Sequence, residues 1–316
     1  MAVQIDGEQY PHQPVLYHEI ILALNPKSPG RYVDATVGTG GHAWGILKTS
    51  EPEGLLLGLD VDPQALALAS QRLAVFEGRA VLRQASYAAL QIELQKIGWE
   101  SVSGIVLDLG VSSLQLNTPE RGFSFQSDGP LDMRFDPTTG TSAADLVNHL
   151  AENQLADLLW RYGEERLSRK IARAICAARP IHSTQELAQI ILMVNRGGGS
   201  RIHPATRTFQ ALRIAVNQEL QAIEMVLPQA VAVLQPGGRL AVIAFHSLED
   251  RIVKQFFRQE SKDCICPTDQ PACTCGHRAS LREITRRPIV PNEAEIQQNS
   301  RARSARLRVA EKLQLA

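Results

Sequence analysis

A glycine-rich turn near the N-terminus carries the residues best suited to hold a ligand. Residues 32–42 (YVDATVGTGGH) run from apolar, β-branched side chains into three glycines. Glycine lets the backbone turn tightly and approach a ligand without a Cβ atom, and a helix that starts after the turn offers free N–H groups. Asp60 lies twenty residues after Gly40, at the end of the next apolar run. An acid at that place suits a pair of ribose hydroxyls, so the pattern predicts a cofactor that contains a ribose.

Two cofactors fit this turn, and a turn that binds nothing is the third interpretation. Residues 38–43 (GTGGHA) satisfy the dinucleotide pattern G-x-G-x-x-G/A, which permits NAD. Asp34 would instead hold an ammonium group and repel a pyrophosphate. Tyr87 follows the third predicted strand, where its ring could stack on adenine, and Asp108 ends the fourth, at the crevice where such sheets bind ligands. These three residues favour S-adenosylmethionine.

The elements that must position these residues alternate between strands and helices. The short apolar runs that predict buried strands are residues 31–36, 55–60, 80–83, 104–109 and 239–245. Residues 63–74 and 87–97 between them have helical patterns, and Asp62 followed by Pro63 is a good helix start. Strands that alternate with helices predict an α/β fold with a parallel sheet covered on both faces.

The alternation is interrupted between the fourth and fifth strands. We expect an ordered loop over residues 117–140, helices over 142–178 and 184–194, a flexible connector at 196–200 (RGGGS) and one long helix over 204–227. After the fifth strand come a predicted helix over 249–260, a cysteine-rich hairpin and a strand-like 305–310. The chain therefore divides into residues 1–116, an inserted helical part, 117–215, and 216–316.

Six motifs, in this order, resemble those of the bacterial RsmH (MraW) family. They are residues 108–113 (DLGVSS), 121–125 (RGFSF), 128–134 (DGPLDMR), 162–166 (YGEER), 203–213 (HPATRTFQALR) and 245–254 (FHSLEDRIVK). With 12–15 (HQPV) and 300–304 (SRARS), the resemblance covers nearly the whole chain. It implies a class I (Rossmann-like) S-adenosylmethionine-dependent methyltransferase sheet whose last strand is antiparallel, with the insert as the substrate-recognition domain. It also implies methylation of the exocyclic N4 amine of a cytidine in the decoding centre (P-site) of 16S rRNA in the small ribosomal subunit.

The resemblance also implies which residues contact the cofactor. By motif match, the cofactor contacts fall on Gly40, Gly41, His42, Asp60, Tyr87, Asp108 and Gln115. Tyr87 stands where the family often has Phe, which keeps a stacking surface. Their places after the fourth and fifth predicted strands, rather than the resemblance, make Asp108 and His246 the catalytic candidates. Asp108, or a backbone carbonyl in residues 109–112, would accept a hydrogen bond from the target amine, or Asp108 would contact the cofactor only. The Pro-Pro of the D/N-P-P-Y turn in DNA amino-methyltransferases is absent here, which weakens the analogy with their mechanism.

Other residues could serve the substrate, and each has a structural alternative. His246 could orient the flipped base or take its proton, or it could bond within its own loop. The aromatic and basic residues of 121–134 could stack and bind phosphate, or they could anchor the loop in a core. In the predicted long helix a polar stripe could face the active site or RNA, or merely solvent; its residues are Arg207, Gln210, Arg213 and Asn217.

Four of the five cysteines, Cys264, Cys266, Cys273 and Cys275, lie within twelve residues. Four thiols can hold a tetrahedral zinc ion, but C-x-C spacing is less typical of zinc sites than C-x-x-C. We therefore predict no metal site and a compact loop with free or redox-labile thiols, with zinc as the alternative. Cys176, on an alanine-rich helix, is expected to pack in a core.

Charge is unevenly distributed along the chain. The 33 basic and 33 acidic residues cancel in the total, but residues 1–112 have a net charge of −5 and residues 276–316 one of +5. The basic tail, with Arg301, Arg303, Arg306 and Arg308, predicts an rRNA contact. No apolar run reaches the ~18 residues of a membrane span, and residues 1–10 do not resemble a signal peptide, so we expect a cytoplasmic protein. The alternatives are a methyltransferase of another RNA or DNA amine, an NAD-binding oxidoreductase and an RNA-binding scaffold; a homodimer stays open.

Overall fold

A computed structural model describes residues 14–195, 203–267, 270 and 272–314, together with the backbone of 3–5 and 8–10. The chain forms two compact units. The first contains residues 1–110 and 220–316, and the second contains residues 111–219. The predicted insert, 117–215, lies inside the second unit, whereas the predicted connector at 196–200 lies outside the described residues.

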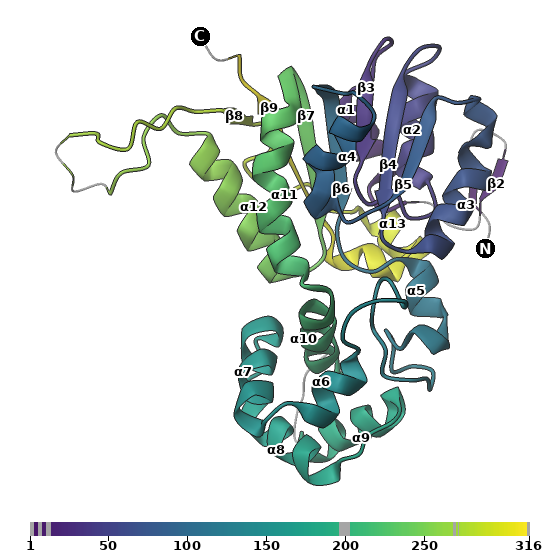
Figure 1. Cartoon of the computed structure of the whole chain (residues 1–316), viewed down its shortest axis with the longest axis vertical. Helices are drawn as coiled ribbons and strands as arrows, with labels where there is room; N and C mark the ends of the chain where they lie inside the picture. The colour runs from purple at the N-terminus through teal and green to yellow at the C-terminus, as the bar shows by residue number, and fades with distance from the viewer. Residues whose placement is uncertain are drawn as a thin grey trace. The chain divides into compact units, whose positions relative to one another are not determined.

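A seven-stranded sheet forms the centre of the first unit (Figure 1). Its order is β5-β4-β3-β6-β7-β9-β8, and the strands are β3 (Arg31–Asp34), β4 (Leu55–Asp60), β5 (Ala80–Gln84), β6 (Val102–Asp108), β7 (Leu234–Ala244), β8 (Leu281–Glu283) and β9 (Arg306–Lys312). The first five run parallel to one another, and β9 is antiparallel to both β7 and β8. The expected α/β class I sheet with an antiparallel last strand is confirmed. A separate pair, β1 (Val3–Ile5) and β2 (Glu8–Tyr10), is also antiparallel.

Helices cover both faces of this sheet because alternate strand residues are apolar on opposite sides. One core joins β-strand residues such as Val33 and Leu107 to α4 (Leu90–Lys96), α11 (Glu219–Val233) and α12 (Ser247–Glu260). The other core joins their neighbours Tyr32 and Val106 to α1 (Tyr17–Leu24), α2 (Gly41–Thr49) and α3 (Pro63–Leu73). The shorter elements of this unit are the 3-10 helices η1 (Ala74–Phe76), η2 (Tyr87–Ala89) and η4 (Ser300–Ser304) and the helix α13 (Glu293–Gln298).

The second unit is helical and has a core of its own. Its helices are α5 (Ser113–Asn117), η3 (Pro119–Arg121), α6 (Ala143–His149), α7 (Glu152–Gly163), α8 (Ser168–Ala178), α9 (Thr184–Val194) and α10 (Thr206–Asn217). The helical pattern predicted over 142–178 is thus three helices separated by short turns. None of the helices in the described parts of either unit is long and apolar enough to cross a membrane.

The prediction of one long helix over residues 204–227 is wrong. Gln218 adopts a left-handed conformation with φ of 51° and ends α10, and its N–H donates to the carbonyl of Ile214. The apolar residues of the predicted single face consequently belong to two cores. Phe209 packs in the helical unit, whereas Leu227 packs against the sheet.

Candidate functional site

The order in which the strands are added to the sheet reverses between its neighbouring strands β3 and β6. From β3 the chain builds outward through β4 and β5, and from β6 it builds the other way. Doubly wound sheets bind ligands beyond the carboxyl ends of the strands at such a switch point. Asp34 is the last residue of β3 and Asp108 the last of β6, and the N–H of Asp108 donates to Thr36 Oγ1 at 2.6 Å. Two carboxylates therefore end adjacent strands at the predicted crevice.

The glycine turn after β3 needs its glycines for both conformation and packing. Gly38 and Gly40 have φ of 51° and 82°, in the left-handed region that favours glycine. Gly40 is the N-cap of α2, and a Cβ on Gly41 would lie 2.2 Å from Cγ of Pro14. The turn leads directly into the N-terminus of α2, as the pattern predicted.

Asp60 braces this turn from the end of β4. Its Oδ2 accepts from the N–H of Gly38 at 2.8 Å, and its Oδ1 accepts from the N–H of Asp62 at 2.9 Å. Burial raises the pKa of Asp60, against the lowering effect of these two N–H bonds. Because a carboxylate oxygen has two lone pairs, Asp60 can still accept from a ligand hydroxyl.

His42 and Asp108 face each other beside the turn. Nε2 of the buried His42 lies 3.5 Å from Oδ2 of Asp108, and the His42 ring stacks on Tyr17 with centroids 6.4 Å apart. Sequence reasoning missed Tyr17, because nothing in the spacing links it to the turn. Within the described part of the chain, neither ring nitrogen of His42 nor Oδ1 of Asp108 has a hydrogen-bond partner. Buried polar atoms are usually paired, so a polar ligand would satisfy these three.

Asp34 is almost completely buried at the same place. It accepts from the N–H of Thr36 at 3.3 Å. Burial raises its pKa to about 7; His42 and the Thr36 bond oppose the rise, while the charges of Asp108 and Asp60 add to it. A cationic group of a ligand would favour the ionised form of this carboxyl.

The remaining predicted cofactor residues lie in different surroundings. Tyr87 is the first residue of η2, directly beyond the carboxyl end of β5, and its side chain is half-buried. Gln115 lies in the helical unit, in a capping box in which its side chain accepts from the N–H of Ser112 at 3.0 Å. The cofactor contacts of both residues stay predictions.

His246 is the N-cap of α12. Its Nδ1 accepts from the N–H of Glu249 at 3.4 Å, and its Nε2 lies 3.2 Å from Oε1 of the fully buried Glu249. Glu249 in turn accepts from the N–H groups of Phe245 and His246. The interpretation of a histidine bonded within its own loop accounts for these contacts, so a catalytic role for His246 stays a prediction.

A hollow of about 450 Å³ lies beside His246, at the carboxyl end of β7. Phe245, His246 and Ser247 line it from this end, and Arg303 and Arg306 line it from the C-terminal region. The hollow combines an aromatic ring, hydroxyl groups and two guanidinium groups, which suits a nucleotide.

The loop after α5 anchors itself in the helical unit. Phe123 is buried and stacks on Phe135 with centroids 5.6 Å apart, and Phe125 stacks on His203 at 4.5 Å. Arg121 is buried and donates to the carbonyls of residues 134 and 135. The core-anchor alternative is therefore confirmed for the buried Phe123 and Arg121, whereas an RNA contact of the half-buried Phe125 stays a prediction.

Most residues of the predicted polar stripe bond within the helical unit. Asn217 accepts from the N–H of Phe135 and donates to the carbonyl of Met133, both at 2.7 Å, and Arg213 forms a two-pronged ion pair with Glu219 at 2.7 and 2.9 Å. Gln210 donates to the carbonyl of Tyr162 near the end of α7, and Arg207 donates to the carbonyl of Glu164 just after that helix. Asn217 and Arg213 therefore have structural contacts inside this unit, whereas Arg207 is exposed, and an RNA contact of the stripe stays a prediction.

Two of the four tail arginines contact a carboxylate of the sheet unit. Arg308 is buried in β9 and contacts Asp250 at 2.6 and 3.2 Å, and Arg306 contacts the same carboxylate at 3.3 Å. Burial raises the pKa of Asp250, but the two arginines outweigh it and hold that pKa below its ordinary value. Arg303 is exposed and lines the hollow beside His246.

The sequence of the chain matches a known protein family and several of its members. The MraW methylase family matches residues 9–313. A ribosomal RNA small subunit methyltransferase H from Dehalococcoides mccartyi is 53% identical over 305 residues, which is 96% of this chain and 87% of that protein. The protein of the same name from Thermomicrobium roseum is 52% identical and covers 96% and 94% of the two chains. A solved structure of a methyltransferase from Streptococcus mutans in complex with SAH is 11% identical, with a TM-score of 0.45 over 96% of this chain and 99% of that one.

Proposed function

Because the chain belongs to the MraW methylase family, we propose that it transfers a methyl group from S-adenosylmethionine to the N4 amine of a cytidine in the decoding centre of 16S rRNA. The observation that carries the rRNA assignment is identity above 50%, over nearly the whole chain, to proteins named ribosomal RNA small subunit methyltransferase H. The choice of the cytidine amine rests on the motif resemblance given above.

The acidic edge of the sheet suits a cationic cofactor. Asp34, Asp60 and Asp108 end β3, β4 and β6, and their carboxylates would repel a pyrophosphate but attract an ammonium or sulfonium group. In this proposal Asp34 holds the ammonium, Asp60 the ribose hydroxyls and Tyr87 the adenine ring. The unpartnered atoms of His42 and Asp108 support the fit. When bound, S-adenosylmethionine supplies an electrophilic methyl group on its sulfur.

Asp108 is the residue best placed to act on the target amine. The lone pair of a cytosine amine is delocalised into the ring, so the amine becomes nucleophilic only as its nitrogen turns tetrahedral. A carboxylate that accepts an N–H hydrogen bond favours that change. Asp108 Oδ2 faces His42, and its Oδ1 has no hydrogen-bond partner within the described residues, so Oδ1 can accept from the amine.

The variant Asp108→Asn separates this catalytic role from a pure cofactor contact. We expect the methyl-transfer rate to fall by roughly 10²–10⁴-fold, the usual range for a lost acid–base group, while the Kd for the cofactor, measured by calorimetry, changes less than tenfold. If methyl transfer survives and cofactor affinity falls, Asp108 is a cofactor contact only.

The substrate must present its base outside any stack or pair, because the crevice cannot reach a base within a helix. The hollow beside His246, with Arg303 and Arg306, offers the matching surface. The test uses radiolabelled S-adenosylmethionine with intact small subunits and, separately, with naked 16S rRNA, followed by digestion to nucleosides. We expect N4-methylcytidine from at least one substrate. Absence of label from both would overturn the enzyme assignment, and label on another nucleoside would overturn the choice of amine. Calorimetry with NAD tests the oxidoreductase alternative, for which we expect no binding.

A further inference from the structure

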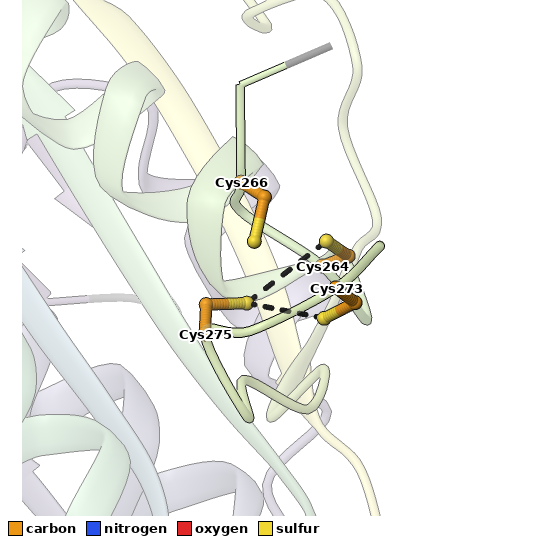
Figure 2. A group of neighbouring side chains, drawn as sticks. All are labelled: Cys264, Cys266, Cys273 and Cys275. Atoms are coloured by element: carbon orange, nitrogen blue, oxygen red, sulfur yellow. Dashed lines mark hydrogen bonds between the residues drawn. The ribbon is translucent and has the colours of Figure 1, made fainter. Parts of the chain in front are cut away.

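The cysteine-rich hairpin between α12 and β8 brings four thiols together (Figure 2). All four sulfur atoms lie within 4.8 Å of one another; they belong to Cys264, Cys266, Cys273 and Cys275. The Sγ atoms of Cys273 and Cys275 are 3.6 Å apart, and those of Cys275 and Cys264 are 3.9 Å apart. The four cysteines are free thiols, not disulfides, and Figure 2 shows their sulfurs pointing toward one another.

These spacings match the edges of a metal–sulfur tetrahedron. A Zn–S bond is about 2.3 Å long, so sulfurs at the corners of a ZnS₄ tetrahedron lie about 3.8 Å apart. The two measured Sγ–Sγ distances fall on either side of that value. Three of the four thiols are joined by these two distances and the fourth lies within 4.8 Å of the others, so the group is compact enough to surround one zinc ion.

The structure shows that C-x-C spacing can form such a site here. The two pairs, Cys264 with Cys266 and Cys273 with Cys275, each bring both sulfurs to the same group of four. The spacing that argued against zinc in the sequence is thus compatible with zinc in this conformation.

Backbone amides converge on the same sulfurs. The N–H groups of Ile265 and His277 donate to Sγ of Cys275, and the N–H of Thr274 donates to Sγ of Cys266, each at 3.5 Å. Donors of this kind stabilise the negative charge that thiolates carry as metal ligands. The ring of His277 lies elsewhere, with Nε2 at 3.2 Å from the carbonyl of Gln259, so the donor set is four sulfurs.

The hairpin has no hydrophobic core that could hold this arrangement. None of its described residues between 261 and 280 is buried, and Ile265 is 41% exposed. Figure 1 shows the segment extending away from the sheet beyond α12 and β8. Small segments that cannot bury apolar surface need a disulfide or a metal to fold. The cysteines of this hairpin are reduced, so they could hold it together as ligands of a metal ion.

We propose that Cys264, Cys266, Cys273 and Cys275 bind one structural Zn²⁺ as a tetrathiolate, in place of the metal-free loop that the spacing predicted. Each thiol loses its proton when it binds the ion. Four sulfur ligands complete the tetrahedron and leave no position for water or substrate, so the ion stabilises the hairpin and takes no part in methyl transfer. Tetrahedral S₄ sites also suit iron, and the experiment separates the two metals.

The test measures metal in the full chain, purified without chelator and without a metal-affinity tag. By elemental analysis we expect about one zinc per wild-type chain and per chain of the matched control Cys176→Ser, whose thiol lies in α8 outside the cluster. The double variant Cys273→Ser/Cys275→Ser should hold less than a tenth of that amount. Wild-type protein without zinc, with iron in its place, or with zinc that the double variant retains would overturn the proposal.

Two further measurements on wild-type protein do not depend on the folding of a variant. Replacement of the zinc by Co²⁺ should give the visible absorption of a tetrahedral cobalt tetrathiolate; an octahedral cobalt spectrum would contradict the site. With zinc bound, alkylation should modify Cys176 at most, and a zinc chelator should expose four further thiols. Limited proteolysis should then cut between residues 261 and 280, and cutting that is equally fast with and without chelator would refute the structural role.

Discussion

The buried ion pair between Arg308 and Asp250 permits a quantitative prediction about stability. The side chain of Arg308 is 7% exposed and that of Asp250 is 9% exposed, and their closest contact is 2.6 Å. Loss of one partner of a buried pair costs about 3–5 kcal/mol, because the other charge stays buried without compensation. Arg308→Ala leaves Asp250 with Arg306 at 3.3 Å, whose side chain is 52% exposed. This weaker partner places the expected loss at the lower end, about 3 kcal/mol.

Urea unfolding of the full chain at pH 7 measures this loss. The free energy of unfolding of Arg308→Ala should fall by about 3 kcal/mol, which corresponds to roughly 6–12 °C in Tm for a unit of this size. The matched control is Arg303→Ala, an exposed arginine of the same tail, for which we expect a change within about 0.5 kcal/mol. The double variant Asp250→Leu/Arg308→Met should recover most of the loss, because an apolar pair can replace a buried ion pair.

The pH dependence of the same variant gives an independent check. The ion pair lowers the pKa of Asp250 in the folded chain, so its contribution is present above the ordinary carboxyl pKa and is lost as pH falls through the lower folded value. The difference between wild type and Arg308→Ala should therefore shrink in acid. Equal stability of the two proteins at pH 7 would refute the structural role of Arg308 and restore the sequence interpretation, in which all four tail arginines serve RNA.

Two further predictions concern the site itself. Burial raises the pKa of Asp34 to about 7 in the folded chain. The protonated carboxyl therefore contributes its full stability below about pH 3.8, and this contribution is lost as pH rises to about 7. Asp34→Asn should flatten that part of the stability profile in urea unfolding, and a variant with the wild-type slope would contradict the shift. Arg303→Ala should reduce the slope of the logarithm of the rRNA association constant against the logarithm of the salt concentration by about 0.7, the value for one phosphate contact on a single strand. Cofactor affinity, measured by calorimetry, should stay unchanged. An unaltered slope would show that the hollow does not contact rRNA.

The sheet could be predicted from the sequence because its signals are local. Each parallel strand contains a run of apolar residues, and Asp34, Asp60 and Asp108 lie at or near the ends of three of these runs. Parallel strands place their carboxyl ends at one edge, so the spacing alone predicted that these acids would gather there. The contact between His42 and Asp108 is the geometric result of that rule.

The errors arose where tertiary packing decides the local structure. Nothing in the residues around Gln218 signals a helix end, since neither Gly nor Pro stands there, yet the chain must pass there from the core of the helical unit to that of the sheet. Phe125 and His203 lie far apart in the sequence, so their stacking was not visible as a core contact. Arginine on a basic tail indicates nucleic acid by composition, but Arg308 alternates inward on β9 and meets a carboxylate from α12.

The cysteine hairpin shows why spacing alone is a weak guide to metal ligands. The preference for C-x-x-C concerns the number of residues between two thiols, whereas a metal requires that the sulfurs meet in space. In this hairpin both C-x-C pairs bring their sulfurs to one group. The count of four thiols could be read from the sequence, but their convergence required the conformation. If the zinc experiment succeeds, the convergence of the sulfurs in this hairpin is therefore a better guide to its metal binding than the number of residues between its thiols.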